Sequence, residues 1–157
     1  VEKPLAYITQ TTLSVDEAKD TIAALRERFP NIIGPSAGDL CYATGNRQAA
    51  VRELCSKVDL LLIVGSSNSS NSTRLSELGK KCGIPSYLIS SVEDLNFDWF
   101  KNVETVGLSS GASAPDILVQ GVQQAICAKF PDILVENSVT LVENLHFPLP
   151  KELQEDK

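Results

Sequence analysis

Two Ser-rich loops are the first sign of chemistry in this chain. Residues 65–72 read GSSNSSNS, residues 109–115 read SSGASAP, and each loop runs from an apolar segment into a predicted helix. A helix start offers unpaired backbone N–H groups and a partial positive charge, and small hydroxyl and amide side chains add donors without blocking an anion. The two loops therefore indicate a phosphate or diphosphate site built without Lys or Arg. The alternative is that these residues only cap helices and form turns.

Nucleotide motifs are missing from both loops. Neither has the G-x-x-x-x-G-K-[ST] pattern that cradles ATP phosphates, and the chain has no G-x-G-x-x-G for a dinucleotide. A third polar segment, TQTT at residues 9–12, follows a predicted strand and precedes a helix cap. It could aim hydroxyl groups at the same cavity, or it could form a turn.

The four cysteines stand 14, 27 and 45 positions apart, without a C-x-x-C pair. Such sparse spacing favours a reducing cytoplasm over a disulfide scaffold. Cys55 and Cys82 fall on apolar helical stripes and Cys127 lies in a late helical turn, so all three are interpreted as small buried hydrophobic residues. Cys41 differs, because it sits just before a helix N-terminus, where the local field favours the thiolate. His146 is the one histidine, which argues against a His-based triad or zinc site.

The elements before residue 35 form too little structure to be a domain. They are a strand at 5–9, a helix opened by the capping box 14–17 and stopped by Pro30, and a brief strand at 32–33. The helix carries an apolar stripe of Ala18, Ile22, Leu25 and Phe29. Two strands and one helix bury little surface, so residues 1–34 are predicted to be the C-terminal end of a preceding α/β domain.

A regular alternation of strands and helices follows the Gly- and Pro-containing boundary at 34–38. The predicted elements are helix 45–58, strand 59–64, helix 72–82, strand 86–89, strand 103–108 and helix 115–129. Continuously apolar strands separated by helices indicate an α/β fold with a parallel sheet flanked by helices. Residues 35–131 are therefore assigned to one α/β domain with the anion-binding loops at the carboxyl ends of its strands. Residues 132–157 are assigned to a C-terminal arm with a possible strand at 139–142.

Composition excludes several classes of protein. Against 20 Asp and Glu the chain has 14 Lys and Arg, a formal charge of −6, which argues against binding to nucleic-acid phosphates. The apolar run around residues 60–64 is far shorter than the roughly 18–20 residues of a membrane-spanning helix. The N-terminus has no signal-peptide pattern. The chain contains no Met, so we expect it to be a piece of a longer protein.

Four segments together resemble one known family. They are TQTTLSVDE (9–17), CYATGNRQ (41–48), VGSSNSSNSTRL (64–75) and SSGASAPDILVQ (109–120). In this order they resemble 4-hydroxy-3-methylbut-2-enyl diphosphate reductase of the LytB type, which ends the non-mevalonate isoprenoid pathway. The resemblance runs from about residue 5 to the arm, and the chain looks like the C-terminal half of such an enzyme.

The resemblance implies an iron–sulfur reductase of the cytoplasm. Its fold would be three α/β domains in pseudo-threefold symmetry around an oxygen-sensitive 4Fe-4S cluster held by three Cys. Two electrons and protons would remove the substrate hydroxyl, giving isopentenyl and dimethylallyl diphosphate. The electrons would come from a flavodoxin or ferredoxin. No nucleic acid or membrane partner is expected.

Site residues follow from the resemblance by position. Cys41 matches one cluster ligand, Thr11 an active-site threonine near the substrate hydroxyl, and the diphosphate-binding positions are Ser69, Ser70, Asn71 and Ser113. The family's other two cluster cysteines, its substrate-contacting histidines and its proton-relaying Glu belong to an N-terminal half that this chain lacks. We therefore expect this chain alone to hold no stable cluster and to have no reductase activity.

Two other functions stay open from the residues. One is a non-redox α/β module that binds a phosphorylated metabolite, in which case replacing Cys41 would change little. The other is a hydrolase that uses a loop serine, but no G-x-S-x-G elbow and no suitably placed His support it.

Overall fold

The computed structural model describes residues 3–13, 15–35 and 42–139, and it confirms the α/β class. The helices are α1 (Val15–Arg28), α2 (Tyr42–Cys55), α3 (Ser70–Lys81) and α4 (Asp116–Lys129). The strands are β1 (Leu60–Val64), β2 (Ser86–Ile89) and β3 (Val106–Ser110), and two short 3-10 helices, η1 (Val92–Asp94) and η2 (Phe97–Phe100), lie between β2 and β3. No helix in these ranges is long and apolar enough to span a membrane.

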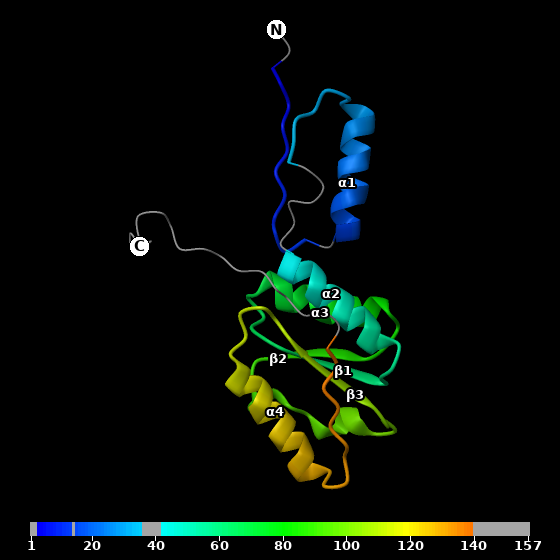
Figure 1. Cartoon of the computed structure of the whole chain (residues 1–157), viewed down its shortest axis with the longest axis vertical. Helices are drawn as coiled ribbons and strands as arrows, with labels where there is room; N and C mark the ends of the chain where they lie inside the picture. Colours follow the sequence, from blue (N-terminus) through cyan, green and yellow to red (C-terminus); the bar gives the residue numbers. More distant parts are fainter. Residues whose placement is uncertain (1–2, 14, 36–41, 140–157) are drawn as a thin grey trace, which may run out of the picture.

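The three strands form one parallel sheet, as the apolar runs predict, and their order in the sheet is β2-β1-β3. Helices cover both faces of this sheet (Figure 1). Because successive strand residues point to opposite faces, the central strand β1 feeds two cores. Leu62 and its neighbours on one face pack with Val122 of α4, and Ile63 on the other face packs with Val51 of α2 and Leu75 of α3. Every residue of β1 is fully buried.

The start of α3 and the second turn of α2 both lie at the carboxyl edge of this sheet. Helix α3 begins soon after β1 ends at Val64. In α2, the Arg47 side chain reaches the last residue of β3, because its Nη1 donates to the Ser110 carbonyl at 3.4 Å. One edge of the sheet therefore gathers polar groups from two helices and two strand ends.

Element boundaries differ from the sequence prediction by up to three residues, and the largest shifts are in β3 and α2. Strand β3 occupies 106–110 instead of 103–108, because the Asp59 carboxylate accepts hydrogen bonds from the Glu104 and Thr105 N–H groups and holds them in a turn. Helix α2 starts at Tyr42 and ends at Cys55 instead of spanning 45–58. After Cys55 the chain forms a tight turn, in which the Lys57 N–H donates to the Leu54 carbonyl.

The predicted strands of the N-terminal part shrink to a single parallel bridge between Ala6 and Ile33. The Tyr7 N–H donates to the Ile33 carbonyl and the Ile33 N–H to the Leu5 carbonyl, both at 2.9 Å. An isolated pair of strands is marginal without further strands or a covering helix. Only Ala18 of the α1 stripe is buried, and the Ile8 side chain is 93% exposed. We call residues 3–35 the N-terminal unit and residues 42–130 the sheet domain.

The stretch from Pro131 to Val139 has no helix or strand. Of the possible strand at 139–142, only Val139 is among the described residues. His146 lies outside them.

Candidate functional site

The two Ser-rich loops meet at the side chain of Ser72, in the first turn of α3. A Cβ atom added to Gly65, just after β1, or to Gly111, just after β3, would overlap the Ser72 Oγ. The Gly111 N–H also donates to the Val64 carbonyl at 2.9 Å, which ties the ends of β1 and β3 together. Glycine is required at both positions by this close approach. The helix start therefore rests directly on the ends of two neighbouring strands.

The first turn of α3 has the features of an anion site. Ser69 is its N-cap, and the Ser69 Oγ accepts a hydrogen bond from the Ser72 N–H at 3.4 Å. Ser70 is exposed, whereas the Asn71 side chain is only 6% exposed. Backbone N–H groups in the first turn of a helix have no intrahelical partner and carry partial positive charge. These donors lie in the turn whose Ser72 side chain contacts Gly65 and Gly111 at the ends of β1 and β3.

Several buried polar atoms at this edge lack a hydrogen bond within the described part of the chain. They are Asn71 Nδ2, Asn71 Oδ1, Ser72 Oγ and Gln48 Oε1. A buried polar group without a partner costs about 1–3 kcal/mol, and native structures contain few of them. Such atoms beside a helix N-terminus are donors and acceptors that a polar ligand could satisfy.

Helix α2 adds polar groups that the sequence prediction missed. Thr44 and Gln48 are 5% and 3% exposed, and their spacing of four residues puts them on one face of the helix. Arg47 brings a guanidinium group to the end of β3, close to the place where the sequence predicts an anion site built without Lys or Arg. The segment CYATGNRQ contained the signal, since polar residues at i and i+4 precede the buried Val51 on the same helical face.

Ser113 lies in the second loop, between Gly111 and the start of α4. Its side chain is exposed, and the loop is turned by the Ala114 N–H, which donates to the Gly111 carbonyl at 3.1 Å. The structure thus keeps Ser113 on the loop that touches the α3 helix start, as the sequence predicts.

Thr11 lies in the N-terminal unit and is exposed. Its segment turns through the Leu13 N–H, which donates to the Gln10 carbonyl at 3.2 Å. The neighbouring Thr12 has a buried hydroxyl for which the described residues supply no partner. Thr9 lines a cavity of about 500 Å³ together with Arg74 of α3, so this segment approaches the helix that carries Asn71.

The three described cysteines are less buried than predicted. Cys82 is exposed, because it is the C-cap that follows α3 and is no part of a buried stripe. Cys55 and Cys127 are half-buried. Burial is the main cause that raises the pKa of Cys55 to about 11, and the neighbouring Cys82 thiol adds to the shift. The raised pKa disfavours the thiolate that binds metal. Cys41 lies outside the described residues.

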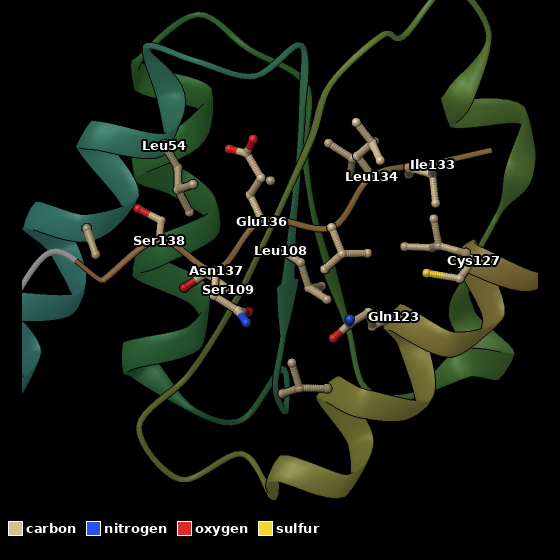
Figure 2. Close-up of a pocket in the computed structure, with 16 residues that line it drawn as sticks. Leu54, Leu108, Ser109, Gln123, Cys127, Ile133, Leu134, Glu136, Asn137 and Ser138 are labelled. Atoms are coloured by element: carbon tan, nitrogen blue, oxygen red, sulfur yellow. The ribbon is translucent and has the colours of Figure 1, made fainter. Parts of the chain in front are cut away.

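A further, more apolar pocket lies elsewhere in the sheet domain. A pocket of about 330 Å³ lies between β3, α4 and residues 133–138, and Figure 2 shows this segment crossing in front of the sheet, with Leu54 of α2 on one side and Cys127 of α4 on the other. Apart from the carboxylate of Glu136, its lining carries no charge. A lone carboxylate repels an anion, and none of the predicted site residues lines this pocket. The carboxyl edge of the sheet is therefore the better candidate for phosphate chemistry.

Comparison with known proteins gives a consistent result over nearly the whole chain. The family model described as LytB protein matches residues 1–127. The chain is 53% identical over 153 residues to 4-hydroxy-3-methylbut-2-enyl diphosphate reductase of Zymomonas mobilis, covering 98% of this chain and 45% of that protein. It is 51% identical to the enzyme of the same name from Hamiltonella defensa, covering 98% of this chain and 48% of that protein.

A solved structure is similar in fold as well. The E-1-hydroxy-2-methyl-but-2-enyl-4-diphosphate reductase from Plasmodium falciparum superimposes with a TM-score of 0.83 at 36% identity, over 96% of this chain and 48% of that chain. The chain therefore spans about half the length of the relatives it matches.

Proposed function

Because the chain belongs to the LytB protein family, we propose that it supplies the diphosphate-binding part of a 4-hydroxy-3-methylbut-2-enyl diphosphate reductase. The observation that carries the proposal is the α3 helix start, where the buried Ser72 side chain lies against Gly65 and Gly111. The polar atoms of Asn71 and the Ser72 hydroxyl there have no hydrogen-bond partner among the described residues. The relatives of about 50% identity that bear this enzyme name support the choice of substrate. Since the chain covers about half of those relatives, the whole reaction belongs to a longer protein.

The proposed diphosphate ligands are Ser69, Ser70, Asn71 and Ser113, together with the backbone N–H groups that open α3. A hydrogen bond to a charged group contributes about 1.5–3 kcal/mol, so several such bonds anchor a diphosphate without a dedicated lysine. Thr11 is proposed to act near the substrate hydroxyl. Anchoring by these groups binds substrate and transition state alike, so it positions the substrate without supplying the reducing power.

An iron–sulfur cluster does not fit the described residues by themselves. No group of three His, Cys, Asp or Glu side chains that could hold a metal ion occurs among them, and the raised pKa of Cys55 opposes ligation. We propose Cys41 as the one cluster ligand from this chain, with two further cysteines from the other half of a longer reductase. The electron donor, a flavodoxin or ferredoxin, and a cytoplasmic location are parts of the same proposal.

The chain alone is proposed to lack reductase activity and a stable cluster, because one cysteine cannot replace three. Anaerobic reconstitution of the isolated chain with iron and sulfide tests this directly. We expect iron and sulfide contents well below the stoichiometry of one cluster. A stoichiometric cluster on the isolated chain would contradict the proposal.

The domain organisation is proposed on similar grounds. Residues 1–34 would be the end of a preceding α/β domain, residues 35–131 the diphosphate-binding domain, and residues 132–157 an arm. The exposed apolar side chains of the N-terminal unit support the first boundary, since Ile8 and Ile33 are 93% and 63% exposed and would be covered by the rest of such a domain.

A binding module without redox chemistry is the second candidate, because the polar first turn of α3 would suit an anion whether or not a cluster is present. Replacement of Cys41 separates the two. In the longer protein, Cys41→Ser should abolish cluster-dependent reduction if Cys41 is a ligand. In a pure binding module it should leave diphosphate affinity and every other activity unchanged.

Diphosphate binding by the chain is the direct test of the proposed site. Titration calorimetry with inorganic diphosphate should show binding that Asn71→Ala weakens by roughly 10- to 100-fold, the loss of one hydrogen bond to a charged group. Gln124→Ala, an exposed polar residue on α4, is the control and should bind as the unaltered chain does. Equal affinity of the Asn71 variant and the control would place the anion elsewhere.

A further inference from the structure

The buried amide of Gln48 is the feature of the carboxyl edge that the proposed function leaves unexplained. Gln48 is 3% exposed, and its Oε1 has no hydrogen-bond partner among the described residues. Buried amides without a partner are rare because the lost hydration is not repaid. A Met or Leu side chain would pack equally well at this position, so packing does not explain why the side chain carries an amide.

The positions of two neighbours place Gln48 beside the first turn of α3. Arg47, the residue before Gln48, donates to the carbonyl of Ser110 at the end of β3. Ser72 follows Asn71 in the chain and packs against Gly111, which follows Ser110. One turn further along each helix, Val51 and Leu75 lie in the same buried cluster. Helices α2 and α3 thus share one core, with Gln48 one turn before Val51 and Asn71 one turn before Leu75.

The chemistry of the two amides is complementary. The Asn71 Nδ2 group has two N–H donors, and a carbonyl oxygen such as Gln48 Oε1 accepts. One N–H can serve an anion and the other can serve Gln48, whereas a single bond to the anion would leave the amide free to rotate. Both ends of the Asn71 amide lack a partner within the described ranges, so a rotation that joins it to Gln48 breaks no existing hydrogen bond.

We infer that Gln48 is a positioning residue of the anion site, whose Oε1 accepts a hydrogen bond from Asn71 Nδ2 and thereby holds the second Nδ2 hydrogen toward the bound phosphate oxygen. Gln48 acts through Asn71 and does not touch the anion. The inference rests on the proposed function, because it needs an anion at the α3 helix start. It adds a residue from α2, so the site uses the packing of two helices as well as two loops.

A double-mutant cycle with inorganic diphosphate tests this inference on the full chain. Gln48→Met keeps the size of the side chain and removes the acceptor, and loss of one hydrogen bond should weaken diphosphate binding by about fivefold. In the Asn71→Ala background the same change should have no further effect on Kd. Gln124→Met on exposed α4 surface is the matched control. Thermal unfolding of every variant shows whether the fold is retained.

The possible outcomes separate the inference from the proposed function. If Gln48→Met leaves Kd unchanged while the unaltered chain binds diphosphate, the inference is overturned and the proposed site stands. An equal loss of affinity in both backgrounds also overturns it, since Gln48 would then act on the fold or on the anion directly. If the unaltered chain does not bind diphosphate, the proposed function of this chain fails, and the inference fails with it.

Discussion

The N-terminal unit and the sheet domain contain similar apolar strand residues but bury them very differently. Ile33 forms the bridge of the N-terminal unit and stays 63% exposed, whereas Ile63 in β1 is fully buried. The difference lies in the neighbours. Strand β1 is hydrogen-bonded on both edges and covered on both faces, whereas the bridge joins two single residues and lies alongside helix α1 (Figure 1). An apolar sequence therefore becomes a core only where enough layers surround it.

The largest effect expected from this contrast is on stability. Leu62→Ala should lower the free energy of unfolding by about 2–5 kcal/mol. Leu62 of β1 is fully buried on the face that packs against α4, so the substitution leaves a cavity there. Ile33→Ala should change it by no more than about 0.5 kcal/mol, as is usual for an exposed position. Urea unfolding followed by circular dichroism measures both. Similar losses for the two variants would show that the N-terminal unit shares the core.

A smaller effect is expected where the loops meet α3. Gly111→Ala should cost about 1–3 kcal/mol of unfolding free energy, because the new Cβ overlaps Ser72 Oγ. It should also weaken diphosphate binding by moving the helix start away from the strand ends.

The matched control for this change is Gly45→Ala in α2. Nothing lies within 4 Å of a Cβ at Gly45, so this helical Gly-to-Ala change should stabilise the chain by about 0.5–1 kcal/mol. The same measurements apply to both variants. A neutral Gly111→Ala would mean that the close approach of the loops to Ser72 is not required.

The smallest effect is a pH dependence inside the sheet domain. Burial and the Cys82 thiol raise the pKa of Cys55 from 9.0 to about 11, so the folded chain keeps this proton where the unfolded chain loses it. The contribution of Cys55 to stability is therefore present below pH 9 and is lost as pH rises toward 11. Alkylation followed by peptide mass spectrometry near pH 9 should modify exposed Cys82 before Cys55. Equal rates would show that Cys55 is not held in the packed interior.

Much of the sheet domain could be predicted from local patterns. The continuous apolar run of β1 predicted a strand buried on both faces, and the loop GSSNSSNS predicted a helix start after it, which α3 confirms. The resemblance to LytB-type reductases is confirmed by the family model. The assignments of Thr11, Ser69, Ser70, Asn71, Ser113 and Cys41 remain predictions.

Errors arose where a distant residue decides the outcome. The shift of β3 depends on Asp59, whose carboxylate holds Glu104 and Thr105 in a turn from 45 and 46 residues away in the chain. The exposure of Cys82 depends on where α3 ends. Periodicity describes a segment by itself and contains no information about such partners.

The sequence by itself determined the α/β alternation, the family and the loops that open α3, because each depends on residues close together in the chain. Only the tertiary structure decided that Gly65 and Gly111 both close on Ser72 and that Arg47 and Gln48 of α2 come to the same edge. The physical reason is that parallel strands bring their carboxyl ends together whatever their separation in sequence, so the site forms only when the sheet and both helices have packed.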